Sequence, residues 1–158
     1  MKENCAVCEA YLDLVNSHVI PSLKRLLCYN TPTTFHIQFP PSLRLQPGRP
    51  SKLHGKVHND REYGHHDGEL NFWIQLTNHS ETGVCLFVET SEGSGDYFPL
   101  DGQDLHMFHG TRCRHYVAEN QSDSTRVSID FRIGIVPFYD PSYKMEGVPQ
   151  HGRRQIVA

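Results

Sequence analysis

The sequence predicts a single, mainly β domain, built as a sandwich or barrel behind one N-terminal helical segment. Beyond residue 33 the chain is a series of short segments rich in β-branched and aromatic residues, separated by Pro, Gly, Asn and Ser. Short strands at turn-separated intervals are typical of β sandwiches and barrels. The length of 158 residues suits one domain. We therefore expect a helical segment at 1–30, a β core at 33–136, and a loop and tail at 137–158.

Helical periodicity is confined to residues 4–28. Ala6, Ala10 and Leu14 recur at intervals of four residues, which places them on one face of a helix. Pro21 has no backbone N–H and predicts a kink or a second short helix within this segment.

Alternating apolar and polar residues predict most of the strands. The predicted strands are 35–39, 42–46, 69–77, 84–89, 105–108, 113–117 and 125–135. Residues two apart on a strand face the same way. In 69–77, Phe72 and Ile74 therefore share one face, while Asn71 and Trp73 share the other. Asn71 and Trp73 look into the barrel if the apolar face packs outward; Trp73 could equally be a plain core residue.

Composition limits the possible partners. The net charge is −3 and the pI is about 6.4, which gives no electrostatic case for nucleic acid. No apolar run approaches the roughly 18 residues of a membrane helix. The start has no signal-like apolar stretch, so we expect a cytoplasmic protein with reduced thiols, and we interpret Cys5 and Cys8 as cysteines of a terminal helix. A small-molecule substrate is expected, and the oligomeric state is left open.

Three separated residues predict a metal site. In His58-Asn59-Asp60 the histidine and the carboxylate are two residues apart, so on an extended chain they reach one ion together. His115 follows 55 residues after Asp60, where a barrel returns to its own mouth. Two histidines and one carboxylate on one face of an octahedral ion form the non-haem Fe(II) arrangement, which leaves three positions open.

A second motif follows on the last predicted strand. Arg126 and Ser128 share a face eleven residues beyond His115. A guanidinium and a hydroxyl on the inner face of a barrel form a clamp for a carboxylate. Arg132 shares the same face and competes for that role, although a salt bridge with Asp130 or Glu89 suits its position better.

Taken together, His58-x-Asp60, His115 and Arg126-x-Ser128 resemble the signature of Fe(II)/2-oxoglutarate-dependent dioxygenases over about residues 42–134. The sequence around these motifs resembles a subgroup of biosynthetic tailoring oxygenases. The segments that carry this resemblance are HNDREYGHHDGELNFW, GTRCRHY and TRVSIDFR. The resemblance implies a double-stranded β-helix, also called a jelly roll or cupin-like barrel.

The resemblance also implies roles for these residues. His58, Asp60 and His115 would bind Fe(II), and Arg126 and Ser128 would bind the distal carboxylate of 2-oxoglutarate. With O2 as the third reactant, hydroxylation of an unactivated C–H bond, with release of succinate and CO2, is the default outcome. Desaturation, ring closure and epimerisation stay open.

Several residues near the motif are further candidates for the site. Tyr63 and His65 lie just past the metal pair and, with Asn71 and Trp73, are candidates for the substrate pocket. His65, His66 and Glu69 could suggest a cupin-type metal site, but adjacent strand residues face opposite ways, so one histidine at most could point inward.

Two alternatives remain open: a non-catalytic cupin-like binding module, and a cupin dioxygenase that uses no 2-oxoglutarate. The first has no need for the complete set of Asp60, His115 and Arg126. The second would leave Arg126 and Ser128 without a role. An iron-dependent halogenase is disfavoured because Asp60 fills the position that halide would need.

Overall fold

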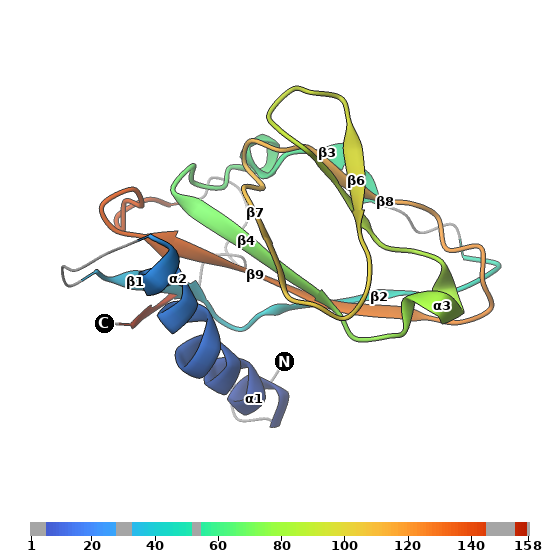
Figure 1. The fold of residues 1–158 in the computed structure, drawn as a ribbon, viewed down its shortest axis with the longest axis horizontal. Coiled ribbons are helices and arrows are strands. Elements are labelled where there is room, and N and C mark those ends of the chain that lie inside the picture. Colours follow the sequence, from blue (N-terminus) through green and yellow to red (C-terminus); the bar gives the residue numbers. More distant parts are fainter. Residues whose placement is uncertain (1–5, 28–32, 52–54, 145–153, 158) are drawn as a thin grey trace.

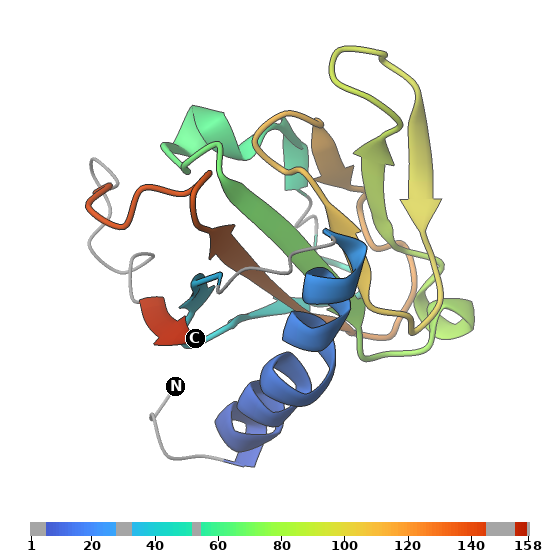
Figure 2. The same cartoon turned by 60° about the vertical axis from the view of Figure 1, so that its left-hand side comes forward.

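Two antiparallel β-sheets and an N-terminal pair of helices make up the protein in the computed structural model (Figure 1). The structure describes residues 6–27, 33–51, 55–144 and 154–157, the last four as backbone only. The helices pack on one face of the larger sheet, and the smaller sheet covers part of the other face (Figures 1 and 2). The fold is therefore mainly β, as predicted.

The larger sheet has six strands. In sheet order these are β10 (Arg154–Val157), β1 (Phe35–Gln38), β9 (Arg126–Ile135), β4 (Glu69–Gln75) and β7 (His106–Phe108), with β2 (Ser42–Gln46) also paired to β9. The smaller sheet has the order β3 (Gly55–His58), β8 (His115–Val117), β5 (Leu86–Glu89) and β6 (Tyr97–Leu100). The ten-residue strand β9 pairs with β1, β2 and β4 and is the axis of the larger sheet.

The helical segment consists of α1 (Ala6–Leu14), a π-helical stretch at Val15–Val19, and α2 (Ile20–Leu26). Pro21 lies at the start of α2, directly after the π-helical stretch, where the hydrogen-bond pattern of the helix already departs from the regular α form. The expected second short helix is confirmed. Val15, which is fully buried, packs with Phe35 and Phe131 in the core between the helices and the larger sheet.

The two faces of β9 have different neighbours. Phe131 and Ile133 face the helices, and Phe131 stacks on Phe72 of β4 with ring centroids 5.1 Å apart. Arg126 and Ser128 lie on the other face and line the space between the sheets. The alternation expected for this strand is confirmed, and it places the polar residues of the site on the inner face.

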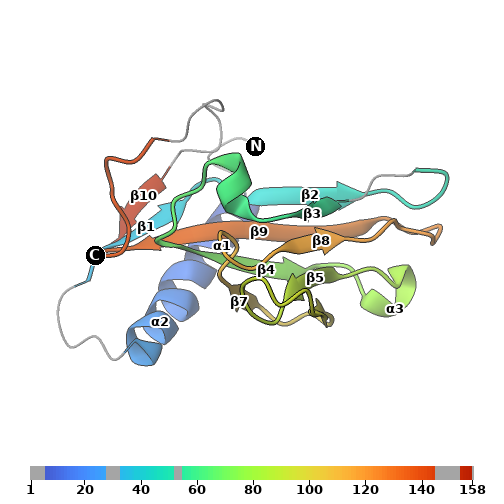
Figure 3. The same cartoon turned by 90° about the horizontal axis from the view of Figure 1, so that it is seen from above.

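The structure also corrects the sequence prediction. Residues 154–157 were expected in a loop and tail, but they form β10, which pairs with β1 (Figure 3). Without β10, β1 would leave a row of backbone donors and acceptors unpaired at the sheet edge. The strands β3 and β6 were not predicted either, nor were the short helices η2 (Asp60–Tyr63) and α3 (His79–Thr82).

The cysteines in the described part of the chain are thiols. Cys8 is buried in α1 and packs in the core, as expected of a helix cysteine, whereas Cys5 lies outside the described residues. Cys85 and Cys113 are also free. None of the helices in the described ranges has the length and apolar character that crossing a membrane requires.

Candidate metal and carboxylate site

A cavity of about 1050 Å³ lies between the two sheets. Strands β2, β3, β4, β8 and β9 and the short helix η2 contribute to its wall. All nine residues that the sequence indicated line it: His58, Asp60, Tyr63, His65, Asn71, Trp73, His115, Arg126 and Ser128. The structure therefore brings the two motifs and the expected pocket residues into one space.

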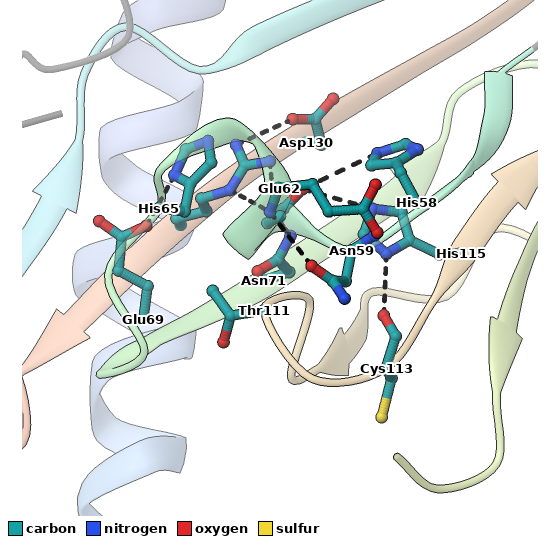
Figure 4. Close-up of polar contacts among 12 residues, drawn as sticks. His58, Asn59, Glu62, His65, Glu69, Asn71, Thr111, Cys113, His115 and Asp130 are labelled. Atoms are coloured by element: carbon teal, nitrogen blue, oxygen red, sulfur yellow. Dashed lines mark hydrogen bonds and ion pairs between the residues drawn. The ribbon is translucent and has the colours of Figure 1, made fainter. Parts of the chain in front are cut away.

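His58, Asp60 and His115 come together at one end of this cavity. One ligating atom from each lies within 4.8 Å of the others, and in the described part of the chain no other cluster of three such residues meets that spacing. His58 and His115 are directly opposite each other across the β3–β8 pair, with ring centroids 4.4 Å apart (Figure 4). Nε2 of His115 lies 3.4 Å from Asp60 Oδ1, and Nε2 of His58 lies 3.9 Å from it.

Each imidazole is held by its other nitrogen. Nδ1–H of His58 donates to the Lys56 carbonyl at 2.6 Å. Nδ1–H of His115 donates to the Cys113 carbonyl at 3.1 Å, a contact that Figure 4 shows. A carbonyl only accepts, so the proton must be on Nδ1 and a neutral ring keeps its lone pair on Nε2. Burial is the main cause that lowers the pKa of His58, which favours that neutral ring. Both Nε2 lone pairs are therefore available to an ion.

The two carboxylate oxygens of Asp60 have different neighbours. Oδ2 accepts from Asn71 Nδ2 at 2.6 Å and from Arg132 Nε and Nη2 at 2.8 and 2.7 Å. Oδ1 faces the two histidines. Burial would raise the pKa of Asp60, but the contacts with His115, Arg132 and Asn71 outweigh it and hold the pKa far below its ordinary value. Asp60 is therefore ionised, and one of its oxygens is free for an ion.

Local structure explains why the pair His58 and Asp60 points one way. β3 ends at His58, and η2 begins at Asp60. Between them Asn59 is extended, and its side chain accepts from Glu62 N–H while the Glu62 carboxylate accepts from Asn59 N–H. This capping box fixes the backbone between the two residues, so they project to the same side.

The donor set fits a non-haem iron. Two imidazoles that present Nε2 and one carboxylate, in a cluster open on the cavity side, match the two-histidine, one-carboxylate triad with open positions.

Arg126 lies on the inner face of β9 and is 4% exposed. Its Nε donates to Gln46 Oε1 at 2.9 Å, and its Nη1 donates to Ser128 Oγ at 2.9 Å. Within the described ranges, no carboxylate lies within 4.0 Å of this guanidinium. Burial lowers the pKa of Arg126, partly offset by Asp130, yet an arginine stays charged. A buried cation without a protein anion is suited to an anionic ligand.

Arg132 is already paired. It contacts Asp60, and its Nη1 lies 3.6 Å from Asp130 Oδ1. The expected salt bridge with Asp130 is confirmed, and the alternative with Glu89 is wrong, because Glu89 accepts from the backbone N–H groups of Gly95 and Arg114 instead. The close pairing with Asp60 was not predicted.

The other pocket candidates have distinct surroundings. Tyr63 is 57% exposed at the rim, and its ring contacts the His58 ring edge-on at 4.9 Å. His65 is buried, with Nδ1 2.9 Å from Glu69 Oε2, so the two are hydrogen-bonded to each other away from the metal cluster. Trp73 both lines the cavity and packs with Leu86 in the second core cluster, which combines its two predicted roles.

Sequence reasoning missed the supporting partners. Asn71 was expected only at the substrate pocket, but it fixes Asp60, and Gly110 lets it do so because a Cβ there would collide with the Asn71 amide. Gln46 was not singled out, although it lies opposite Arg126 in the β2–β9 pair. The available signal was the alternation of polar and apolar residues in 42–46, which places Gln46 on the face opposite Leu45.

Comparison with known proteins agrees with this picture at the level of the fold. No family model matches the chain. The streptomycin biosynthesis protein StrG of Streptomyces griseus is 29% identical over 107 residues, which cover 68% of this chain and 50% of StrG. This chain thus spans about half the length of that relative.

Among solved structures, a nickel complex of the non-haem monooxygenase ThoJ superposes with a TM-score of 0.56 at 16% identity, covering 86% of this chain and 64% of ThoJ. The epimerase SnoN in complex with Fe3+, α-ketoglutarate and nogalamycin RO gives 0.57 at 14% identity, covering 90% and 66%. The fold of this chain is therefore the one found in these non-haem enzymes. In that fold it carries a His-Asp-His cluster.

Proposed function

We propose that this protein is an Fe(II)- and 2-oxoglutarate-dependent oxygenase with a double-stranded β-helix, or jelly-roll, fold. One observation carries the proposal: a single cavity holds both the cluster of His58, Asp60 and His115 and a buried Arg126 that lacks a carboxylate partner in the described part of the chain. A metal-only dioxygenase would not need Arg126, and a simple binding module would not need the three-residue cluster.

In this proposal the residues divide the work. Nε2 of His58, Nε2 of His115 and Oδ1 of Asp60 hold Fe(II), while Arg132 and Asn71 keep Oδ2 of Asp60 occupied. Arg126 and Ser128 bind the distal carboxylate of 2-oxoglutarate. Fe(II) with 2-oxoglutarate supplies the activation of O2, in which one oxygen atom enters a C–H bond and the other enters succinate as CO2 leaves.

The cavity favours a small-molecule substrate. The residues that line it include Tyr63, Leu43 and Leu45, whose side chains are exposed. Those groups suit the apolar face of a compact organic molecule. The relative StrG is named for streptomycin biosynthesis, and SnoN is described from nogalamycin biosynthesis, which supports a substrate from the biosynthesis of a small natural product. Hydroxylation is the outcome that we propose.

The proposal is tested by binding under argon and then by turnover. Fe(II)-loaded protein should develop a visible charge-transfer band when 2-oxoglutarate is added, and His115→Ala protein should not. In air, a panel of natural-product precursors should be screened for succinate formation that depends on the added compound. Parent protein that binds Fe(II) but shows neither the band nor 2-oxoglutarate binding by calorimetry would contradict the proposal.

A further inference from the structure

The surroundings of Arg126 contain uncharged amides. Strands β2, β9 and β4 are neighbours in the larger sheet, and two cross-strand pairs meet at this point: Gln46 opposite Arg126, and Gln75 opposite Ser128. Directly opposite residues of an antiparallel pair lie on the same face with their Cβ atoms about 5 Å apart. Two glutamines therefore flank the guanidinium and the hydroxyl on the inner face.

Gln46 is itself firmly held. Its side-chain Nε2 donates to the Ala118 carbonyl at 2.8 Å, and its backbone carbonyl accepts from Asn120 Nδ2 at 3.2 Å. With the amide nitrogen committed to Ala118, the amide oxygen is directed at Arg126 Nε, 2.9 Å away. Ala118 and Asn120 follow directly after β8, the strand that begins with His115. The segment that carries His115 thus also holds Gln46, which in turn orients Arg126.

Because Nε is occupied, only one edge of the guanidinium is left. A guanidinium has five N–H groups. Gln46 takes the one on Nε and Ser128 takes one on Nη1; for the other three, no acceptor is found within the described ranges. An incoming carboxylate must therefore approach the edge formed by Nη1 and Nη2, next to the Ser128 hydroxyl.

The charge around this edge sets what can bind. The nearby Arg44 is paired with Asp130 at 2.7 Å, so Arg126 is the cation left to meet a ligand. Gln75 is fully buried, and neither its amide oxygen nor its amide nitrogen has a hydrogen-bond partner in the described part of the protein. Unmet hydrogen-bonding capacity thus lies beside Ser128. Arg44, which is opposite Ser128 in the β2–β9 pair, has its positive charge balanced by Asp130.

We propose that Gln46 is a positioning residue of the carboxylate site, which turns the Nη1–Nη2 edge of Arg126 toward the cavity. The amides of Gln46 and Gln75 carry no charge and the Arg44–Asp130 pair carries no net charge, so that the site accepts a ligand end bearing one negative charge. This inference rests on the proposed function for the identity of the ligand, 2-oxoglutarate. A carboxylate meets these requirements, whereas a phosphate dianion would leave one negative charge without a partner.

The test replaces the neutral amide by an internal carboxylate. Gln46→Glu supplies Arg126 with its own anion and loses the hydrogen bond from Nε2 to the Ala118 carbonyl. Because a charge-assisted pair is worth more than one neutral hydrogen bond, metal-free, ligand-free protein should melt at a higher temperature than the parent. The same variant, loaded with Fe(II) under argon, should bind 2-oxoglutarate at least about tenfold more weakly. A role in packing alone would not move these two quantities in opposite directions. Gln103→Glu, at an exposed position, is the charge-matched control and should change neither.

A second variant covers the case in which Gln46→Glu does not fold. Gln46→Met keeps the length of the side chain but cannot accept from Nε, so it should also weaken 2-oxoglutarate binding, by about three- to tenfold. The inference is overturned if Gln46→Met binds 2-oxoglutarate as tightly as the parent, or if Gln46→Glu melts no higher than Gln103→Glu. If the parent itself binds no 2-oxoglutarate, the proposed function fails, and the ligand-free melting temperatures still decide whether Gln46 positions Arg126.

Discussion

Two nitrogens of Arg132 contact the same oxygen of Asp60, Oδ2: Nε at 2.8 Å and Nη2 at 2.7 Å. Both side chains are buried, at 8% and 3% exposure. The opposite oxygen of Asp60 faces His115. The arginine therefore orients the carboxylate and balances its charge, and both effects should be measurable.

Arg132→Met should weaken metal binding. Without the guanidinium, Asp60 loses the contacts that orient it, and loss of such a supporting partner typically costs 10- to 100-fold in metal affinity, about 1.4–2.8 kcal/mol. Titration of metal-free protein with Fe(II) or Co(II) under argon measures it. Arg49→Met, which removes an exposed pair with Asp123, is the matched control and should bind metal like the parent. Equal affinity in Arg132→Met would show that Asp60 needs no such support.

His58→Ala and His115→Ala should each abolish stoichiometric binding of Fe(II), because each removes one of three ligands. His109→Ala is a control from the same region: His109 lies on the loop before His115 but does not line the cavity. It should keep one metal per chain by calorimetry. If both cluster variants bind iron like the parent, the triad is not the metal site.

Arg126→Lys should keep the metal and lose the cosubstrate. Lysine cannot reproduce a two-nitrogen contact with a carboxylate. A loss of about 1.5–3 kcal/mol, the scale of a charge-assisted hydrogen bond, corresponds to roughly 10- to 150-fold in 2-oxoglutarate affinity. The charge-transfer band under argon reports it, with Fe(II) binding checked separately. If Arg132→Lys keeps Fe(II) but loses 2-oxoglutarate while Arg126→Lys does not, the carboxylate clamp is at Arg132.

Asp67→Asn should destabilise the protein in a pH-dependent way. Hydrogen bonding to Arg112, and then to Arg61 and Thr111, holds the pKa of Asp67 well below its ordinary value. Its contribution is complete above the unfolded pKa of about 3.9 and is lost as the pH falls toward the lower folded value. Because Asp67 is 41% exposed, the loss at neutral pH should be no more than about 1 kcal/mol.

Urea unfolding of metal-free parent and variant at several pH values measures this difference. It should be largest above about pH 5 and should shrink below about pH 4. Asp123→Asn, which breaks the exposed pair with Arg49, should change the free energy of unfolding less. A difference that grows as the pH falls would contradict the assignment.

The inner and outer faces of β9 were predictable because period-two alternation is a property of the strand alone. The same rule placed Arg126, Ser128 and Arg132 together without any knowledge of their neighbours. Which arginine would meet Asp60 was not predictable in this way. That depends on how η2 approaches the far end of β9, a contact between residues 72 positions apart.

The missed strands have a related explanation. β3, β6 and β10 have four residues each, too few to show a period, and they form because a neighbouring strand offers backbone partners. β3 matters most, since it carries His58 opposite His115. The sequence could indicate that these two histidines meet, but not that a strand pair brings them together.

The position of His58 and His115 on facing strands gives a bound cation a structural effect as well. His58 and Asp60 are fixed locally by the Asn59 capping box, so two of the three ligands can assemble from a nine-residue stretch, 55–63. The third arrives only when β8 docks on β3. An ion shared by all three acts as a cross-link that closes the intervening chain, as a disulfide would, and biases the ensemble toward the docked state. Separation of β3 from β8 and release of a bound ion would then be one cooperative event.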